Sequence, residues 1–231
     1  MLLDALSRLR LFSCVNTLGR LEKLKKALLR ELGLELVAPD APHLFSEIDM
    51  DFIDVEDVSD RHSARWQRTW WHLHENSYQG LEESVSMLDR LWNDCNHEFV
   101  AIVGFSQGSR LAHMISLIHT LTNGVAFPGL TCVVHFSGYG DCQLPCNFYS
   151  LMKDNWDQHI LPQSIDDIRM DISSLHVMGE SDTLVPLKAS EALLKWYVQP
   201  SVHRHAGNHF VPVKKPDIDL YLMFFNQVRE R

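Results

Sequence analysis

The sequence lacks the features that mark membrane, nucleic-acid-binding and disulfide-stabilised proteins. No apolar run reaches the roughly 18 residues that a membrane-spanning helix needs. Lysine and arginine form no dense cluster, and the net charge of −9 disfavours a nucleic-acid partner. The five cysteines are an odd number without regular spacing, which is typical of a reducing compartment and not of a disulfide framework. We therefore expect a soluble cytoplasmic protein without a membrane span.

Metal sites are also poorly supported by the sequence. Cys142 and Cys146 flank a proline but offer too few ligands for zinc without further partners. Acidic side chains are dense over residues 46–60, yet their spacing does not follow that of a calcium-binding loop. We expect no metal, and we interpret residues 46–77 as a surface or cap excursion from the fold.

The chain does contain an alternation of apolar strands and amphipathic helices. The strands lack an alternating polar pattern, which is typical of parallel strands buried on both faces. Expected strands cover residues 9–15, 34–42, 99–104, 131–138, 174–179 and 200–205, and expected helices cover 18–33, 78–95, 107–121, 187–197 and 215–230. No internal repeat or linker interrupts the 231 residues. The sequence therefore predicts a single α/β domain, with helices on both faces of a mostly parallel sheet.

A G-x-S-x-G pentapeptide, residues 104–108, lies between an expected strand and an expected helix. This is the context of a nucleophile elbow, where small residues two positions before and after the serine let strand and helix approach. The backbone N–H of Gln107, at the start of the helix, would face a developing oxyanion. We interpret Ser106 as a nucleophile, and an ordinary glycine-flanked turn is the alternative.

A serine nucleophile needs a base, and the base needs an orienting acid. Asp182 follows the expected strand at 174–179, and His209 follows the expected strand at 200–205. The order serine, aspartate, histidine is that of α/β-hydrolases. Because catalytic groups gather at the carboxyl ends of parallel strands, we predict a catalytic triad of Ser106, Asp182 and His209.

Other acids and histidines compete for these roles. Glu180 lies in the same loop as the predicted acid, but the aspartate is deeper in that loop. His203 and His205 fall inside an expected strand, where a side chain packs or lies at an edge. His135 and His176 fall inside apolar strands, and we interpret them as core residues.

Taken together, several segments resemble the family of serine hydrolases (FSH) of the α/β-hydrolase superfamily, and within it the ovarian-cancer-associated-gene-2-like esterases. The similar segments are GFSQG (104–108), SLHVMGESDTLVP (174–186), HAGNHFVP (205–212), VAPDAPHLF (37–45), RTWW (68–71), YQGLEESVSMLDRL (78–91) and FSGYG (136–140). The resemblance implies the α/β-hydrolase fold and a carboxylesterase-type serine hydrolase that cleaves acyl esters or thioesters without a cofactor. It assigns the nucleophile to Ser106, the acid to Asp182 and the base to His209.

The chain departs from this family near its first strand. Members usually have a His-Gly motif there, and the following loop supplies the second oxyanion N–H. Here residues 16–20 read NTLGR instead. In one interpretation the backbone N–H of Asn16 or Thr17 replaces that donor. In the other, one donor is missing and the chain is a catalytically impaired relative that acts as a ligand- or protein-binding module.

Aromatic residues suggest the chemistry of the substrate. Trp70, Trp71 and Tyr139 are candidates for an acyl pocket, with core packing as the alternative. No polar anchor is evident in their segments. We therefore expect a small-molecule ester or thioester with an apolar acyl chain.

Overall fold

The computed structural model describes residues 10–14, 18–44, 68–94, 98–140, 144–156 and 168–230. Several features singled out in the sequence lie outside these ranges: Asn16, Thr17, Cys142 and most of the 46–77 excursion, including its acidic part. In the parts that are described, the order of strands and helices follows the predicted alternation.

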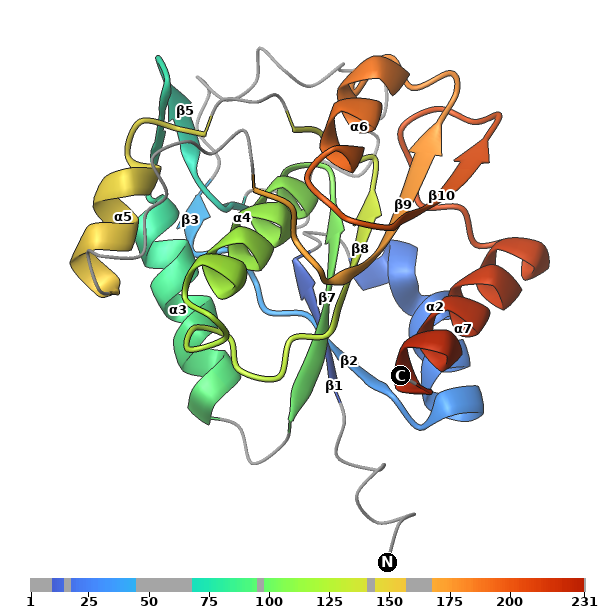
Figure 1. Cartoon of the computed structure of the whole chain (residues 1–231). Helices are drawn as coiled ribbons and strands as arrows, with labels where there is room; N and C mark the ends of the chain where they lie inside the picture. Colours follow the sequence, from blue (N-terminus) through green and yellow to red (C-terminus); the bar gives the residue numbers. More distant parts are fainter. Residues whose placement is uncertain are drawn as a thin grey trace, which may run out of the picture.

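A six-stranded sheet forms the centre of the molecule (Figure 1). Its strands are β1 (Arg10–Cys14), β2 (Glu35–Val37), β7 (Phe99–Phe105), β8 (Cys132–Phe136), β9 (Ser173–Gly179) and β10 (Pro200–His205). They lie in the order β10-β9-β8-β7-β1-β2, and every neighbouring pair is parallel. All strands therefore end at the same edge of the sheet, which brings the loops after β7, β9 and β10 together.

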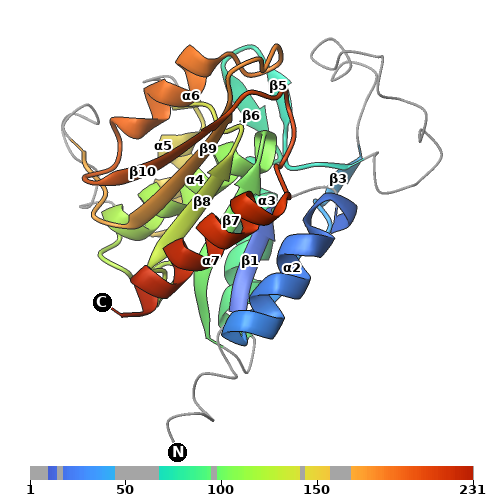
Figure 2. The ribbon, with the colours of Figure 1, turned by 90° about the vertical axis from the view of Figure 1, so that its right-hand side faces the viewer.

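Helices cover both faces of the sheet, as predicted. The helices are α2 (Leu18–Leu32), α3 (Leu81–Asp94), α4 (Gln107–Leu121), α5 (Phe148–Asn155), α6 (Leu187–Leu194) and α7 (Lys215–Arg229). Helices α2 and α7 lie side by side on one face, and α3 and α4 lie on the other (Figures 1 and 2). Each face has its own apolar core.

The central strands contribute side chains to both cores, which explains their continuous apolar sequence. On β7, Ala101 and Val103 pack toward α2 and α7, whereas Ile102 packs toward α3 and α4. All residues of β8 are buried. Burial on both faces removes the alternation that a half-exposed strand would show. None of the helices within the described residues is long and apolar enough to cross a bilayer.

Helix α2 ends where the sequence predicts. Gly33 adopts a φ of 67°, the left-handed conformation that glycine enters without steric cost. Its N–H donates to the carbonyl of Leu29, and the N–H of Leu34 donates to the carbonyl of Leu28. These two bonds close the last turn and satisfy carbonyls that the helix end would leave free.

Short elements were not predicted. The sequence did not predict the strand pair β3 (His43–Leu44) and β4 (Arg68–Thr69), the hairpin of β5 (His72–His74) and β6 (Ser77–Gln79), or helix α5. The helix expected over residues 78–95 starts only at Leu81, and residues 78–80 belong to β6 and a turn. Strands of two or three residues are too short to display a periodicity. Part of the predicted 46–77 excursion, residues 68–77, is thus held in small antiparallel sheets.

Candidate active site

Ser106 occupies a sharp turn between β7 and α4. Its φ of 51° and ψ of −119° are unusual for a residue with a side chain. A Cβ atom added to Gly104 would lie 2.4 Å from both the Gly108 carbonyl oxygen and the Ser109 Cα atom. Only glycine therefore permits this close approach of strand and helix. The Ser106 N–H donates to the carbonyl of Phe136 on β8, which anchors the turn to the sheet.

Asp182 lies in the loop after β9 and is 7% exposed. Its Oδ1 accepts hydrogen bonds from the N–H groups of Leu184 (3.0 Å) and Val185 (2.8 Å). Burial acts to raise the pKa of this carboxyl, but the hydrogen bonds from His209 and from the Val185 backbone outweigh it and hold the pKa below its usual value. The side chain is therefore a carboxylate at neutral pH.

His209 lies in the loop after β10 and pairs with this carboxylate. Its Nδ1 is 2.8 Å from Asp182 Oδ2. Because an ionised carboxylate only accepts hydrogen bonds, the proton of a neutral His209 lies on Nδ1 and the lone pair on Nε2. The ring packs against Phe105, the residue before Ser106, with ring centroids 4.7 Å apart. The three residues of the predicted triad are thus gathered at one edge of the sheet.

The loops that carry Asp182 and His209 are joined by the side chain of Asn208. Its Oδ1 accepts from the N–H of Thr183 (3.0 Å) and from the N–H of His209 (2.8 Å). One oxygen therefore links Thr183, which directly follows the acid, to the proposed base His209. These contacts were not predicted, although an asparagine beside a loop histidine commonly caps nearby backbone N–H groups.

The competing residues have other partners. Glu180 is exposed, and its N–H donates to the carbonyl of His205. His203 Nε2 lies 3.2 Å from Asp217 Oδ1 on α7. His205 Nδ1 accepts from the N–H of Gly207. In the described structure it is Asp182, and not Glu180, that contacts His209.

Two of the three candidates for an acyl pocket are core residues. Trp70 is 0% and Trp71 3% exposed, and both belong to the apolar core beside α3 and α4. Trp71 stacks on Tyr78 with ring centroids 4.6 Å apart. Core packing, the alternative for these tryptophans, is therefore what the structure shows. Tyr139 is half-buried in the loop that follows β8 and remains a candidate.

Buried histidines form a polar network behind the elbow. His135 Nδ1 is 2.8 Å from Ser109 Oγ, and its Nε2 is 2.8 Å from Tyr197 Oη. The His176 ring stacks on that of His135, and His176 Nε2 is 3.1 Å from Ser174 Oγ. The interpretation of His135 and His176 as hydrogen-bonded core histidines is confirmed.

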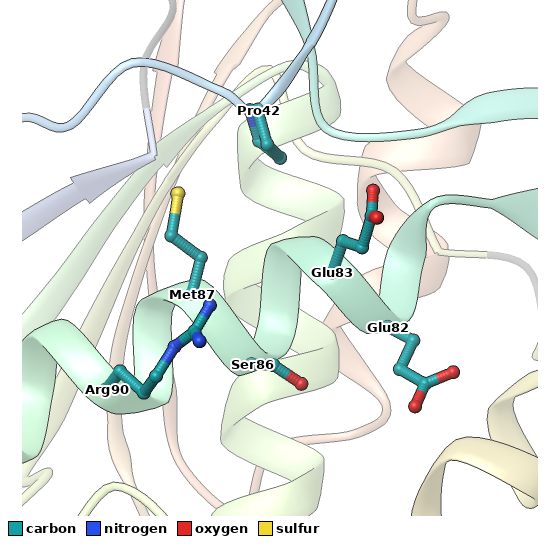
Figure 3. A pocket seen from close by; sticks show the side chains of 6 residues that line it. All are labelled: Pro42, Glu82, Glu83, Ser86, Met87 and Arg90. Carbon is teal, nitrogen blue, oxygen red and sulfur yellow. The ribbon is translucent and has the colours of Figure 1, made fainter.

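A pocket of about 400 Å³ lies on the outer surface of α3 (Figure 3). It is lined by Pro42, Glu82, Glu83, Ser86, Met87 and Arg90. The two glutamates and the arginine are exposed, and none of the lining residues comes from the loops after β7, β9 or β10. This depression is therefore separate from the candidate active site.

Comparison with known proteins points to hydrolases. A family model described as serine hydrolase (FSH1) matches residues 17–221. An esterase of Aedes aegypti is 25% identical over 203 residues, which are 84% of this chain and 64% of that protein, so the chain spans slightly less than two thirds of its length. Esterase OVCA2 of Homo sapiens is 26% identical over 174 residues, 71% of this chain and 69% of that protein.

Solved structures show the same fold. SOBER1 of Arabidopsis thaliana superposes with a TM-score of 0.56 at 15% identity, covering 95% of this chain and 97% of that one. Acyl-protein thioesterase 2 of Zea mays gives a TM-score of 0.56 at 15% identity, covering 95% of this chain and 92% of that one. The predicted α/β-hydrolase fold is confirmed.

Proposed function

The chain belongs to the serine hydrolase (FSH1) family, and from this premise we propose that it cleaves carboxylic esters of apolar acyl chains through Ser106, Asp182 and His209. Thioesters are the alternative substrate class. The observation that carries the proposal is the 2.8 Å contact between His209 Nδ1 and a buried carboxylate, beside a serine held in a strained elbow.

In the proposed reaction, His209 Nε2 removes the Ser106 proton as the serine oxygen attacks the acyl carbonyl. Asp182 holds the imidazole in the required tautomer and stabilises the imidazolium that forms. The alcohol or thiol leaves with the proton from His209, and an acyl-serine remains. Water, activated by the same imidazole, attacks this acyl-enzyme and releases the carboxylic acid. No step of the proposed reaction requires a cofactor.

The negative charge of the tetrahedral intermediate needs preorganised donors. The backbone N–H of Gln107 is the first proposed donor, because it is one of the N–H groups at the start of α4 that have no partner within the helix. Asn16 or Thr17 is the proposed source of the second, and both lie outside the described residues. If neither supplies it, we expect turnover about 100- to 1,000-fold lower than with a full oxyanion hole.

The test is hydrolysis of p-nitrophenyl esters of increasing acyl length. We expect kcat/KM to rise with chain length for the native protein and Ser106→Ala to lose the activity. A profile that is flat or falls with length would contradict the apolar acyl preference. Activity that persists in Ser106→Ala would contradict the assignment of the nucleophile. A native protein that binds the ester without hydrolysing it would favour the alternative function, a ligand- or protein-binding module.

A further inference from the structure

The side-chain amide of Gln107 forms hydrogen bonds with one short segment, residues 69–71. Its Oε1 accepts from the Trp70 N–H at 3.0 Å and lies 2.9 Å from the Thr69 hydroxyl. Its Nε2 donates to the Trp71 carbonyl at 3.0 Å. Residues 69–71 and Gln107 are far apart in sequence, so this amide joins two separate parts of the chain.

The segment that receives Gln107 is itself firmly held. Thr69 is 1% exposed, and the two tryptophans that follow it are buried in the core. The hydroxyl of Ser84 on α3 donates to the Trp70 carbonyl, and Trp71 stacks on Tyr78. Close-packed protein interiors have low compressibility, so residues buried in them are difficult to displace. The amide of Gln107 is therefore fixed against a part of the structure that resists movement.

At its other end, Gln107 adjoins the strained turn. It is the first residue of α4 and directly follows Ser106, whose side chain makes no capping hydrogen bond to the helix. A strained backbone persists only where its surroundings impose it. We propose that the Gln107 side chain is a positioning residue that holds the Ser106–Gln107 peptide, and with it the N–H aimed at the oxyanion. This inference rests on the proposed function, in which that N–H stabilises the intermediate.

A positioning role differs from simple packing in its kinetic signature. If Gln107 only filled space, methionine, which has a similar length, would replace it at little cost. If its hydrogen bonds orient the oxyanion donor, Gln107→Met and Gln107→Ala both lower kcat, because the donor acts most strongly in the transition state. We expect kcat to fall about 10- to 100-fold, with KM changed less than about threefold.

The experiment compares Gln107→Ala and Gln107→Met with Gln227→Ala, which alters an exposed glutamine on α7. Two measurements are made on each full-length variant: ester hydrolysis kinetics, and hydrogen exchange of the peptide that contains residues 69–71. We expect faster exchange in this peptide and a lower kcat in both Gln107 variants. Gln227→Ala should match the native protein in both measurements.

The two readouts separate this inference from the proposed function. Unchanged exchange at residues 69–71 would show that the side chain does not hold the segment. Faster exchange with native kcat, or a native kcat in Gln107→Met alone, would overturn the positioning role while the esterase assignment stands. If the native protein does not hydrolyse esters at all, the proposed function fails and the catalytic part of the inference with it. The exchange measurement then still decides whether the Gln107 side chain holds residues 69–71.

Discussion

Among single residues, Asp182 illustrates how surroundings select one acid from several. Glu180 is two positions away and is chemically similar, yet it is exposed and has no contact with His209 among the described hydrogen bonds. One carboxylate oxygen of Asp182 accepts hydrogen bonds from two backbone N–H groups, and the other accepts a hydrogen bond from His209. These bonds keep the carboxylate ionised and fix its direction, which is what orientation of an imidazole requires.

Asp182→Asn should therefore impair hydrolysis severely. An asparagine keeps the shape, but it can present an N–H to His209 Nδ1 and so favour the wrong tautomer. We expect kcat to fall about 1,000- to 10,000-fold, measured with a p-nitrophenyl ester at neutral pH. The matched control is Glu180→Gln, which should retain native kcat. A large loss in the control together with an active Asp182→Asn would assign the acid to Glu180 instead.

The residue types of the site could be predicted because their chemistry has few alternatives. A serine between two glycines, followed in order by an acid and a histidine at strand ends, reduced the choice to a few candidates in each loop. The hydrogen bonds of the Gln107 side chain to residues 69–71, and of Asn208 to Thr183, could not be predicted, because only the fold brings these partners near. Trp70 and Trp71 were candidates for a pocket but lie in the core. The sequence could not separate these two possibilities, because a large aromatic side chain can pack in a core or line a pocket.

Among elements, the junction of β7 and α4 is tightly constrained by close packing. The strand is buried on both faces, and the helix begins directly after the strained serine. Long elements such as these have enough residues to show their period, so the sequence predicted them well. The small sheets formed by β3 to β6 have two or three residues in each strand, and contacts between distant segments decide where they form.

Gly104→Ala should destabilise the protein through this junction. The added methyl group would lie 2.4 Å from backbone atoms of α4, which cannot rotate away as a side chain can. We expect a loss of about 3 kcal/mol in the free energy of unfolding, measured by urea denaturation. In Gly33→Ala the methyl group meets nothing within 4 Å, so only the left-handed conformation costs energy, about 1 kcal/mol. Equal losses in the two variants would contradict a steric origin.

For the molecule as a whole, buried polar groups of α4, β8 and β9 link stability to pH. His113, His135 and His176 lie inside the protein, and burial lowers the pKa of each. The positive charge of Arg110 lowers the pKa of His113 further. The pKa of His176 falls to about 3. In the unfolded chain these imidazoles take up protons near pH 6.5, so acid favours the unfolded state.

Stability should therefore fall as the pH drops below about 6.5. The three buried histidines together give a slope of up to about 4 kcal/mol per pH unit in the free energy of unfolding. His176→Asn should reduce this slope by about 1.4 kcal/mol per pH unit, whereas His74→Asn, at an exposed hairpin position, should leave it unchanged. The measurement is urea denaturation between pH 7.5 and 4.5. A free energy of unfolding that is constant over this range would contradict neutral, buried histidines.

The central claim, that Ser106 is an activated nucleophile, is tested most directly by labelling with a fluorophosphonate probe and locating the adduct by mass spectrometry. We predict one adduct per folded molecule, on Ser106, formed by the native protein and by Glu180→Gln. We predict no adduct in Ser106→Ala and a strongly slowed reaction in His209→Ala. Folded native protein that forms no adduct, or an adduct that persists in Ser106→Ala, would contradict the claim.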